Sequence, residues 1–160
     1  MSHTILKSPD EIKIMSEAGA RLSGVMEIVC KSVGVGITTI ELDRIAESEI
    51  TKAGCLPSFK GFQDYPAVSC ISINDEIVHG LPGIRVIKNG DLIGIDIGLS
   101  YQGYCSDMAV TLAIGEITKQ EEQLLKATKI SLSIGLEQVK KGNRIGDIGF
   151  AIQQYIERHG

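Results

Sequence analysis

The sequence has 160 residues, of which 43% are hydrophobic and 22% charged, a balance typical of one globular domain with a buried core. Its formal net charge of −4 argues against a general nucleic-acid binder. No run approaches the roughly 20 apolar residues of a membrane span, and the amino-terminal residues become charged before any apolar run forms. We therefore expect a single domain over residues 1–160 of a cytoplasmic protein that binds neither membranes nor nucleic acid specifically.

Two helices are predicted in the first third of the chain, and each begins with a capping box. Ser8 precedes a proline and stands three residues before Glu11, while Thr38 stands three residues before Glu41. Glycines that follow each apolar run mark the helix ends. The inward-facing residues recur at the helical period: Ile14, Ala18, Leu22, Val25 and Val29 in the first helix, and Leu42, Ile45, Ala46 and Ile50 in the second.

The middle of the chain predicts loops and strands, and the last quarter returns to helices. Residues 55–66 form a loop rich in proline, glycine and aromatics, and residues 69–73 form a short strand. A third capping box at Thr118 begins a helix that we expect to end at Gly142, with Leu125, Leu132, Leu136 and Val139 on one side. A fourth helix is predicted from about residue 145 onward.

Residues 91–112 predict a β-hairpin that carries two aspartates. Small and apolar side chains alternate on both arms, and residues 100–103 supply the turn. With the turn centred between Tyr101 and Gln102, Asp96 and Asp107 would be direct cross-strand partners with Cβ atoms roughly 4.5–5.5 Å apart. Two carboxylates this close repel unless a proton or cation lies between them, so a shared metal ion is the simplest interpretation.

Two other arrangements of the hairpin stay open at this point. A strand aspartate is commonly a solvated edge or turn residue. Gly103 could also form a one-residue bulge that sends one carboxylate to the opposite face of the sheet.

Four further residues are candidates for a site. His79 lies between glycine-containing turns and could donate a hydrogen bond to a substrate carbonyl or transfer a proton near neutral pH. A lone histidine is, however, more often structural. Phe62, Tyr65 and Cys70 could line a small apolar pocket suited to a thioether side chain, although loop aromatics are more often anchors to the core. The four cysteines have no CxxC or CxxxC spacing, so we expect reduced thiols rather than a zinc or redox site.

The two ends of the chain contain a possible internal repeat. Each copy has a capped long helix, a glycine break and a shorter amphipathic helix, so that Gly36, Leu42 and Ala46 correspond to Gly142, Ile148 and Ile152. Strands follow the first copy but not the second. If this pseudo-twofold repeat is genuine, the second copy is truncated; helix-glycine-helix patterns are also common by chance.

The chain resembles the N-terminal part of a type I methionine aminopeptidase. The resemblance rests on the segments SPDEIKIM, GITTIELD, YPAVSCISIN, VHGLPG, NGDLIGIDIGLSYQGYCSDMAVT and GNRIGDIGFAIQQYIERHG, which together extend along essentially the whole sequence. It implies an α+β architecture, the pita-bread fold of creatinases and aminopeptidases. It also implies a hydrolase that removes the initiator methionine from nascent polypeptides.

The resemblance assigns roles to the candidate residues. Asp96 and Asp107 match metal ligands of a centre with two divalent ions (Co, Mn, Fe or Zn). His79 matches the catalytic histidine that contacts the substrate. Tyr65 and Cys70 match the pocket for the methionine side chain, and Phe62 stands where the family often has tyrosine. The complete enzyme is expected to be a monomer, and contact with the ribosome is left open.

The departure from the family pattern is equally informative. One histidine and two glutamates that complete the family's ligand set follow the fourth helix, and they have no counterpart in these 160 residues. We therefore expect this chain to be catalytically silent alone. Two alternatives remain: a non-catalytic binding module with the same fold, and a Xaa-Pro peptidase relative that shares the aspartate hairpin.

Overall fold

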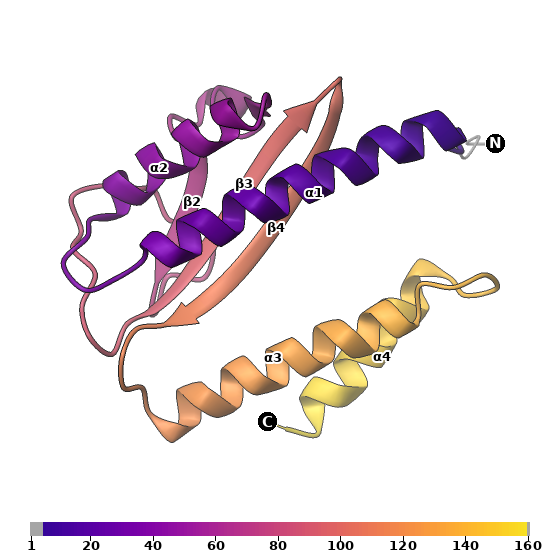
Figure 1. Cartoon of the computed structure of the whole chain (residues 1–160). Coiled ribbons are helices and arrows are strands. Elements are labelled where there is room, and N and C mark those ends of the chain that lie inside the picture. Colours follow the sequence, from indigo (N-terminus) through magenta and orange to yellow (C-terminus); the bar gives the residue numbers. More distant parts are fainter. Residues whose placement is uncertain (1–4, 160) are drawn as a thin grey trace. The chain divides into compact units, whose positions relative to one another are not determined.

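The computed structural model describes residues 5–159. These residues form four α-helices, four strands and a short 3-10 helix: α1 (Pro9–Ser32), α2 (Thr39–Lys52), β1 (Leu56–Pro57), η1 (Phe62–Asp64), β2 (Ser69–Ile73), β3 (Leu92–Tyr101), β4 (Tyr104–Ala113), α3 (Lys119–Glu137) and α4 (Ile145–Glu157) (Figure 1). The chain divides into two compact units, Met1–Glu116 and Ile117–Gly160, and each is described by itself. Among the described residues, no helix is long and apolar enough to cross a lipid bilayer.

The first two helices begin as the sequence predicts. The Ser8 hydroxyl accepts a hydrogen bond from the Glu11 amide, and the Glu11 carboxylate accepts one from the Ser8 amide at 2.6 Å. Thr38 and Glu41 form the same reciprocal box at the start of α2. Each box satisfies amide groups that have no partner within the helix, which fixes the first turn.

The sheet is antiparallel and is built around β3. Strand β4 pairs with β3 along its whole length, and β2 and β1 pair with successive parts of it. The predicted strand at residues 69–73 is confirmed as β2.

The two faces of this sheet have opposite character because side chains alternate along a strand. On one face, isoleucines of β2 and β3 pack beneath α1 and α2, which cover that face in Figure 1. They join the helix stripes in one core, which includes Leu22, Leu42, Ile50, Ile71, Ile93, Ile95, Ile97 and Leu99, each at most 2% exposed. The other face carries small and polar residues: Cys70, Ser72, Gly94, Asp96, Gly98, Cys105, Asp107, Ala109 and Thr111.

The predicted register of the hairpin was wrong by one residue at the turn. The central turn residues are Gln102 and Gly103, with φ of 49° and 82°, and Tyr101 pairs with Tyr104. A two-residue hairpin turn of this kind requires positive φ at both positions and favours glycine at the second. Gly103 therefore lies in the turn and forms no bulge. The shift pairs Asp96 with Ala109, and Asp107 with Gly98.

The second unit is a pair of packed helices. A Cβ built on Gly135 of α3 would lie 2.7 Å from the Ile152 side chain of α4, so glycine permits this close approach. Helix α3 ends at Glu137, earlier than the predicted Gly142, because Lys140 and the Asn143 side chain both donate to the Gln138 carbonyl and close a turn there. Leu132, Leu136 and Val139 are 60%, 62% and 66% exposed, so they form no buried face within this unit.

Candidate metal centre

Asp96 and Asp107 lie on the same face of the sheet, as diagonal neighbours rather than the direct partners that the sequence predicted. Asp96 is opposite Ala109, and Asp107 is two residues from Ala109 on the same strand. Diagonal neighbours of an antiparallel pair are about 7–8 Å apart at Cα, which remains within reach of long or polar side chains. The prediction that one face carries both carboxylates is therefore correct, and their separation along the strands is larger than expected.

The environment of Asp96 disfavours a lone negative charge. Burial raises the pKa of its carboxyl group to about 6, and the charge of Asp107 together with a hydrogen-bonding contact to it acts in the same direction. Among residues 5–159, no donor reaches the buried Oδ1 atom of Asp96. A carboxylate oxygen that is buried without a donor suits a cation, so the residues present fit a metal ion.

His79 lies beside this pair. Its backbone is left-handed, with φ of 58°, and a positive charge on its imidazole would lower the pKa of Asp96. The following residue, Gly80, runs so close to β2 that a Cβ there would lie 2.2 Å from the Ile71 carbonyl oxygen. Hydrogen bonds from the Ile71 amide to the Gly80 carbonyl and from the Gly80 amide to the Ser72 hydroxyl hold the segment in place.

A cavity of about 140 Å³ connects the histidine with one aspartate. Its lining consists of Cys70, Ser72, Ile77, Val78, His79, Gly94, Ile95, Asp96, Ala109, Val110 and Thr111. Three of the residues predicted from the sequence, Cys70, His79 and Asp96, are thus brought together. Asp107, Tyr65 and Phe62 are not part of this lining.

Tyr65 and Cys70 lie close to the aspartates, since Cys70 is the cross-strand partner of Asp96. The Tyr65 hydroxyl donates to the Ser69 carbonyl at 2.9 Å, one residue before Cys70. Burial raises the pKa of Tyr65, and a hydrogen bond with Cys70 contributes in the same direction. Burial also raises the pKa of the Cys70 thiol; the Tyr65 hydrogen bond opposes this, and Asp96 and Asp107 add to it. Tyr65, Cys70 and the aspartates therefore share one electrostatic environment, in which the protonated thiol and the protonated phenol are favoured.

Phe62 is 67% exposed, and a different aromatic residue lies against the aspartate strands. A Cβ on Gly98 would lie 2.5 Å from the Phe59 ring and 2.2 Å from the Ser58 hydroxyl. Gly98 is the direct partner of Asp107 and lies two residues after Asp96. Phe59 thus packs beside the carboxylate pair. Sequence reasoning missed it, and the only available signal was a glycine on the carboxylate-bearing face of a strand.

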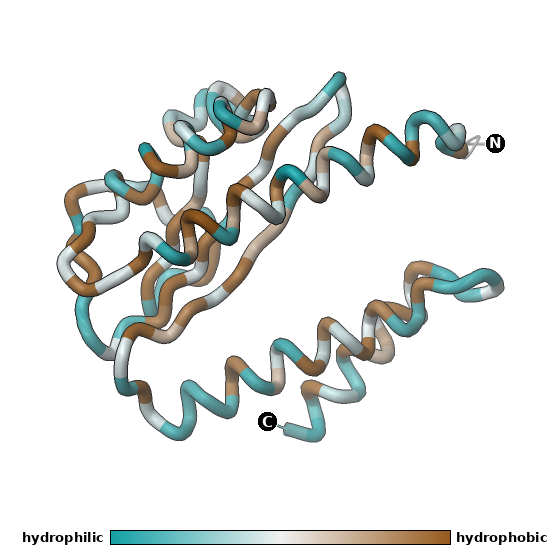
Figure 2. Tube along the Cα trace, viewed as in Figure 1, coloured by the Kyte–Doolittle hydropathy of each residue, from teal (hydrophilic) through white to brown (hydrophobic). Residues whose placement is uncertain are grey.

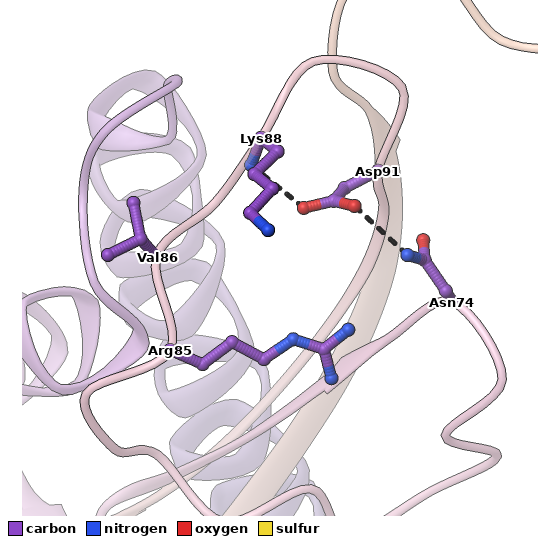
Figure 3. A pocket seen from close by; sticks show the side chains of 5 residues that line it. All are labelled: Asn74, Arg85, Val86, Lys88 and Asp91. Atoms are coloured by element: carbon purple, nitrogen blue, oxygen red, sulfur yellow. Dashed lines mark hydrogen bonds between the residues drawn. The ribbon is translucent and has the colours of Figure 1, made fainter.

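A larger pocket of about 410 Å³ lies elsewhere on the first unit. Asn74, Arg85, Val86, Lys88 and Asp91 line it, and Figure 3 shows Asp91 bridging two of them. The Asn74 side-chain amide and the Lys88 backbone amide donate to Asp91 at 2.9 and 2.8 Å. The Asn74 side-chain oxygen also accepts a hydrogen bond from the amide of Leu92, the first residue of β3. The pocket contains none of the predicted site residues, so we assign it a structural role in closing the loop.

The donor set near the aspartates is small. Over residues 5–159, no group of three or more histidine, cysteine, aspartate or glutamate side chains is arranged to hold a metal ion together. The two carboxylates alone would form only a partial ligand set, and an ion bound by them would need water or further donors to complete its coordination.

Comparison with known proteins decides the family. A model of metallopeptidase family M24 matches residues 13–160. The chain belongs to this metallopeptidase family. Within M24, it is 44% identical over 156 residues to a methionine aminopeptidase of Clostridium perfringens, and the match covers 98% of this chain and 63% of that protein. It is 46% identical over 153 residues to methionine aminopeptidase 1 of Bacillus subtilis, with 96% and 62% covered. The chain thus spans less than two thirds of these relatives' length.

Solved M24 structures confirm the predicted pita-bread fold. A methionine aminopeptidase from Thermotoga maritima superposes with a TM-score of 0.94 at 34% identity, covering 98% of this chain and 63% of that one. An Xaa-Pro dipeptidase from Bacillus anthracis superposes with a TM-score of 0.84 at 24% identity, covering 97% and 42%, and shows the shared fold alone.

Proposed function

We propose that this chain is the metal- and substrate-binding portion of a methionine aminopeptidase that removes the initiator methionine from newly made cytoplasmic polypeptides. The observation that carries the proposal is the pair Asp96 and Asp107 on one sheet face, with a buried Asp96 oxygen that no described donor reaches. The identity to relatives named methionine aminopeptidase supports the choice of methionine over other amino-terminal residues.

Each residue of the site has a distinct task in this proposal. Asp96 and Asp107 hold divalent cations, of which Co, Mn, Fe and Zn all suit oxygen-rich sites with an imidazole. When bound, such ions polarise the scissile carbonyl and lower the pKa of water. His79, on its rigid left-handed backbone, donates a hydrogen bond to the substrate's carbonyl or amide and stabilises charge that develops there.

The apolar wall selects the side chain. Tyr65 and Cys70 contact the methionine thioether, and Phe62 extends this wall from η1. Phe59, which packs on Gly98, lies on the same face of the sheet as the aspartate pair. Soft, polarisable groups and aromatic rings favour a thioether over a charged side chain.

Metal binding tests the aspartates on this chain directly. We expect Asp107→Asn to weaken Mn²⁺ binding by at least about tenfold, because even outer-shell partners of metal ligands usually contribute that much. Electron paramagnetic resonance of free Mn²⁺ measures the affinity. Asp10→Asn, which removes an exposed carboxylate in the first turn of α1, is the matched control. Equal Mn²⁺ affinity in wild type and Asp107→Asn would refute the ligand role.

Activity tests the reaction. With Mn²⁺ or Co²⁺, we expect this chain alone to release no methionine from the peptide Met-Ala-Ser, because two carboxylates are too few to hold two ions tightly. A fusion that adds the unmatched part of the Bacillus subtilis relative is expected to release methionine, and Asp107→Ala in the fusion to abolish release. Methionine release that is equal in the fusion and its Asp107→Ala variant would contradict the proposed centre.

The same fusion separates the two alternative functions. Cleavage of an Ala-Pro peptide in preference to Met-Ala-Ser would indicate an Xaa-Pro peptidase. Binding of Met-Ala-Ser without cleavage, and without any dependence on Mn²⁺, would indicate a non-catalytic module.

A further inference from the structure

We propose that Asp43 is a positioning residue that fixes the Tyr65–Cys70 wall of the candidate metal centre from the opposite side of the sheet. Asp43 lies on α2 and is only 6% exposed. The assignment of that wall to the substrate's side chain rests on the proposed function; the positioning itself rests on contacts in the structure.

One carboxylate oxygen gathers three donors. Oδ1 of Asp43 accepts hydrogen bonds from the Val68 amide at 3.1 Å, the Ser69 amide at 2.9 Å and the Ser69 hydroxyl at 2.7 Å. A buried carboxylate is costly unless donors converge on it, and these three all come from two consecutive residues. Asp43 therefore fixes one short backbone segment, Val68 and Ser69.

The segment that Asp43 holds leads directly into the site. Ser69 is the first residue of β2, and its carbonyl accepts the hydrogen bond from the Tyr65 hydroxyl. The next residue, Cys70, is the cross-strand partner of Asp96. A shift of the Val68–Ser69 backbone would consequently move Tyr65 and Cys70 together, relative to Asp96.

The sheet alone does not fix this segment. Val68 precedes β2, and the residues from Tyr65 to Val68 have no helical or strand structure. Asp43 supplies the bond to the Val68 amide and anchors the loop where the strand begins. Because Asp43 touches neither the cavity nor the aspartate pair, it acts through Ser69.

Thiol labelling measures the positioning without reference to function. Cys70 and Cys55 are 7% and 6% exposed, so they are matched buried thiols in one chain. We expect Asp43→Ala to raise iodoacetamide labelling of Cys70 by about tenfold relative to Cys55, because local opening becomes easier. Asp43→Asn should restore most of the protection, since the amide oxygen can still accept from Val68 and Ser69. Mass spectrometry of the intact, native chain gives both rates.

A control variant comes from one turn earlier on the same helix. Thr39 is 2% exposed, and its hydroxyl bonds to Gly83, not to β2. Thr39→Val removes a buried polar group of α2 and is expected to leave the Cys70 to Cys55 labelling ratio unchanged.

Ligand binding tests the link to the site. In the Mn²⁺-loaded chain, Asp43→Ala should weaken binding of Met-Ala-Ser by about tenfold, the usual effect of a misplaced supporting group, while Mn²⁺ affinity stays within about twofold. If the wild-type chain binds no Met-Ala-Ser, the proposed function fails and the labelling ratio alone decides the positioning role. The proposal would be overturned if Asp43→Ala accelerated iodoacetamide labelling equally at Cys55 and Cys70. It would also be overturned if Asp43→Asn raised the labelling of Cys70 as much as Asp43→Ala does.

Discussion

Gly80 is the residue at which the histidine loop comes closest to the sheet. A Cβ there would lie 2.2 Å from the Ile71 carbonyl oxygen and 2.8 Å from the Ser72 Cα, both backbone atoms of β2 that cannot rotate away. The next glycine of the loop, Gly83, has open space around the same position, with its nearest atom at 4.0 Å. Two glycines of one loop therefore face different constraints.

This contrast gives a prediction for stability. Gly80→Ala should lower the free energy of unfolding by about 1–3 kcal/mol, because overpacking against fixed backbone must displace the loop from β2. Gly83→Ala should change it little. Urea unfolding followed by circular dichroism measures both variants, and a Gly80→Ala protein as stable as Gly83→Ala would contradict the close approach.

Residue identities were predictable from the sequence where the signal is local. Ser8, Thr38 and Thr118 stand three residues before glutamates, and all three are helix caps. Phe59 and Asp43 were missed because their partners are remote in the sequence: Phe59 packs on Gly98, and Asp43 on α2 accepts hydrogen bonds from Val68 and Ser69 at the start of β2. Nothing in their own neighbourhoods indicates those contacts.

The hairpin shows what a sequence predicts well at the level of an element. Its two strands and the shared face of the aspartates follow from alternation, which any even shift in pairing preserves. The turn was placed one residue early because Tyr101, Gln102 and Gly103 all fit a short turn by composition. Only the backbone angles, which put glycine second, select one register.

A disulfide can test that register. Tyr101 and Tyr104 close the turn, and Ser100 and Cys105 are the next pair of direct cross-strand partners. In a two-residue hairpin the pair that closes the turn is hydrogen-bonded. Ser100 and Cys105 therefore form a non-hydrogen-bonded pair, in which the two residues lie closer together. Under mild oxidation, Ser100→Cys should form a bridge to Cys105, detected by the mass of the unreduced protein after thiol alkylation. The same substitution with Cys105→Ser should form none. Absence of the bridge in the first variant would favour the register predicted from the sequence.

The start of α1 and the hairpin are joined through one carboxylate. The Tyr104 hydroxyl donates to Glu11 at 2.7 Å, and the amide and hydroxyl of Ser8 also contact this side chain. Hydrogen bonding, chiefly to the Ser8 amide, lowers the pKa of Glu11 from 4.5 to about 2.

This pKa predicts a pH dependence of stability. A folded-state pKa below the unfolded value favours folding above pH 4.5, and that contribution is lost as the pH falls from about 4.5 through 2. The stability difference between wild type and Glu11→Gln should thus be constant near neutral pH and shrink below pH 4.5. Urea midpoints across this range measure it, with Asp10→Asn as the control from the same turn. A difference that does not change with pH would rule out the shift.

At the scale of the whole molecule, apolar surface remains uncovered on the described residues. Figure 2 shows hydrophobic residues recurring along both α3 and α4. The second unit exposes seven large hydrophobic side chains, on these helices and on the loop between them: Leu124, Leu132, Leu136, Val139, Ile145, Phe150 and Ile156. Monomeric proteins rarely expose apolar patches of this kind without a binding role.

We therefore expect the chain to self-associate in solution. Analytical ultracentrifugation should show species larger than a monomer, and a Leu132→Lys, Leu136→Lys variant should associate less. Thr128→Lys, at an exposed position of the same helix, is the control. A monomer with a sharp, cooperative unfolding transition would speak against this expectation.

Fold and family were accessible from the sequence as a whole. The helix stripes and the alternating strands specify which faces meet, and the M24 match agrees with them. The internal repeat and the assignment of residues 1–160 to one domain stay predictions, because each depends on how distant parts of the chain are placed.

The strict alternation along β3 has a consequence for which sequences this strand can accept. The core-facing positions of this strand require apolar side chains, and polar substitutions there would destabilise the fold: Ile93, Ile95, Ile97 and Leu99. At Gly98, a Cβ would lie 2.2 Å from the Ser58 hydroxyl and 2.5 Å from the Phe59 ring, so any larger side chain would be rejected whatever its polarity. In a saturation library of β3, we accordingly expect the core-facing positions to tolerate substitutions by hydrophobicity and Gly98 on the other face to tolerate them by size. Asp96 follows neither rule.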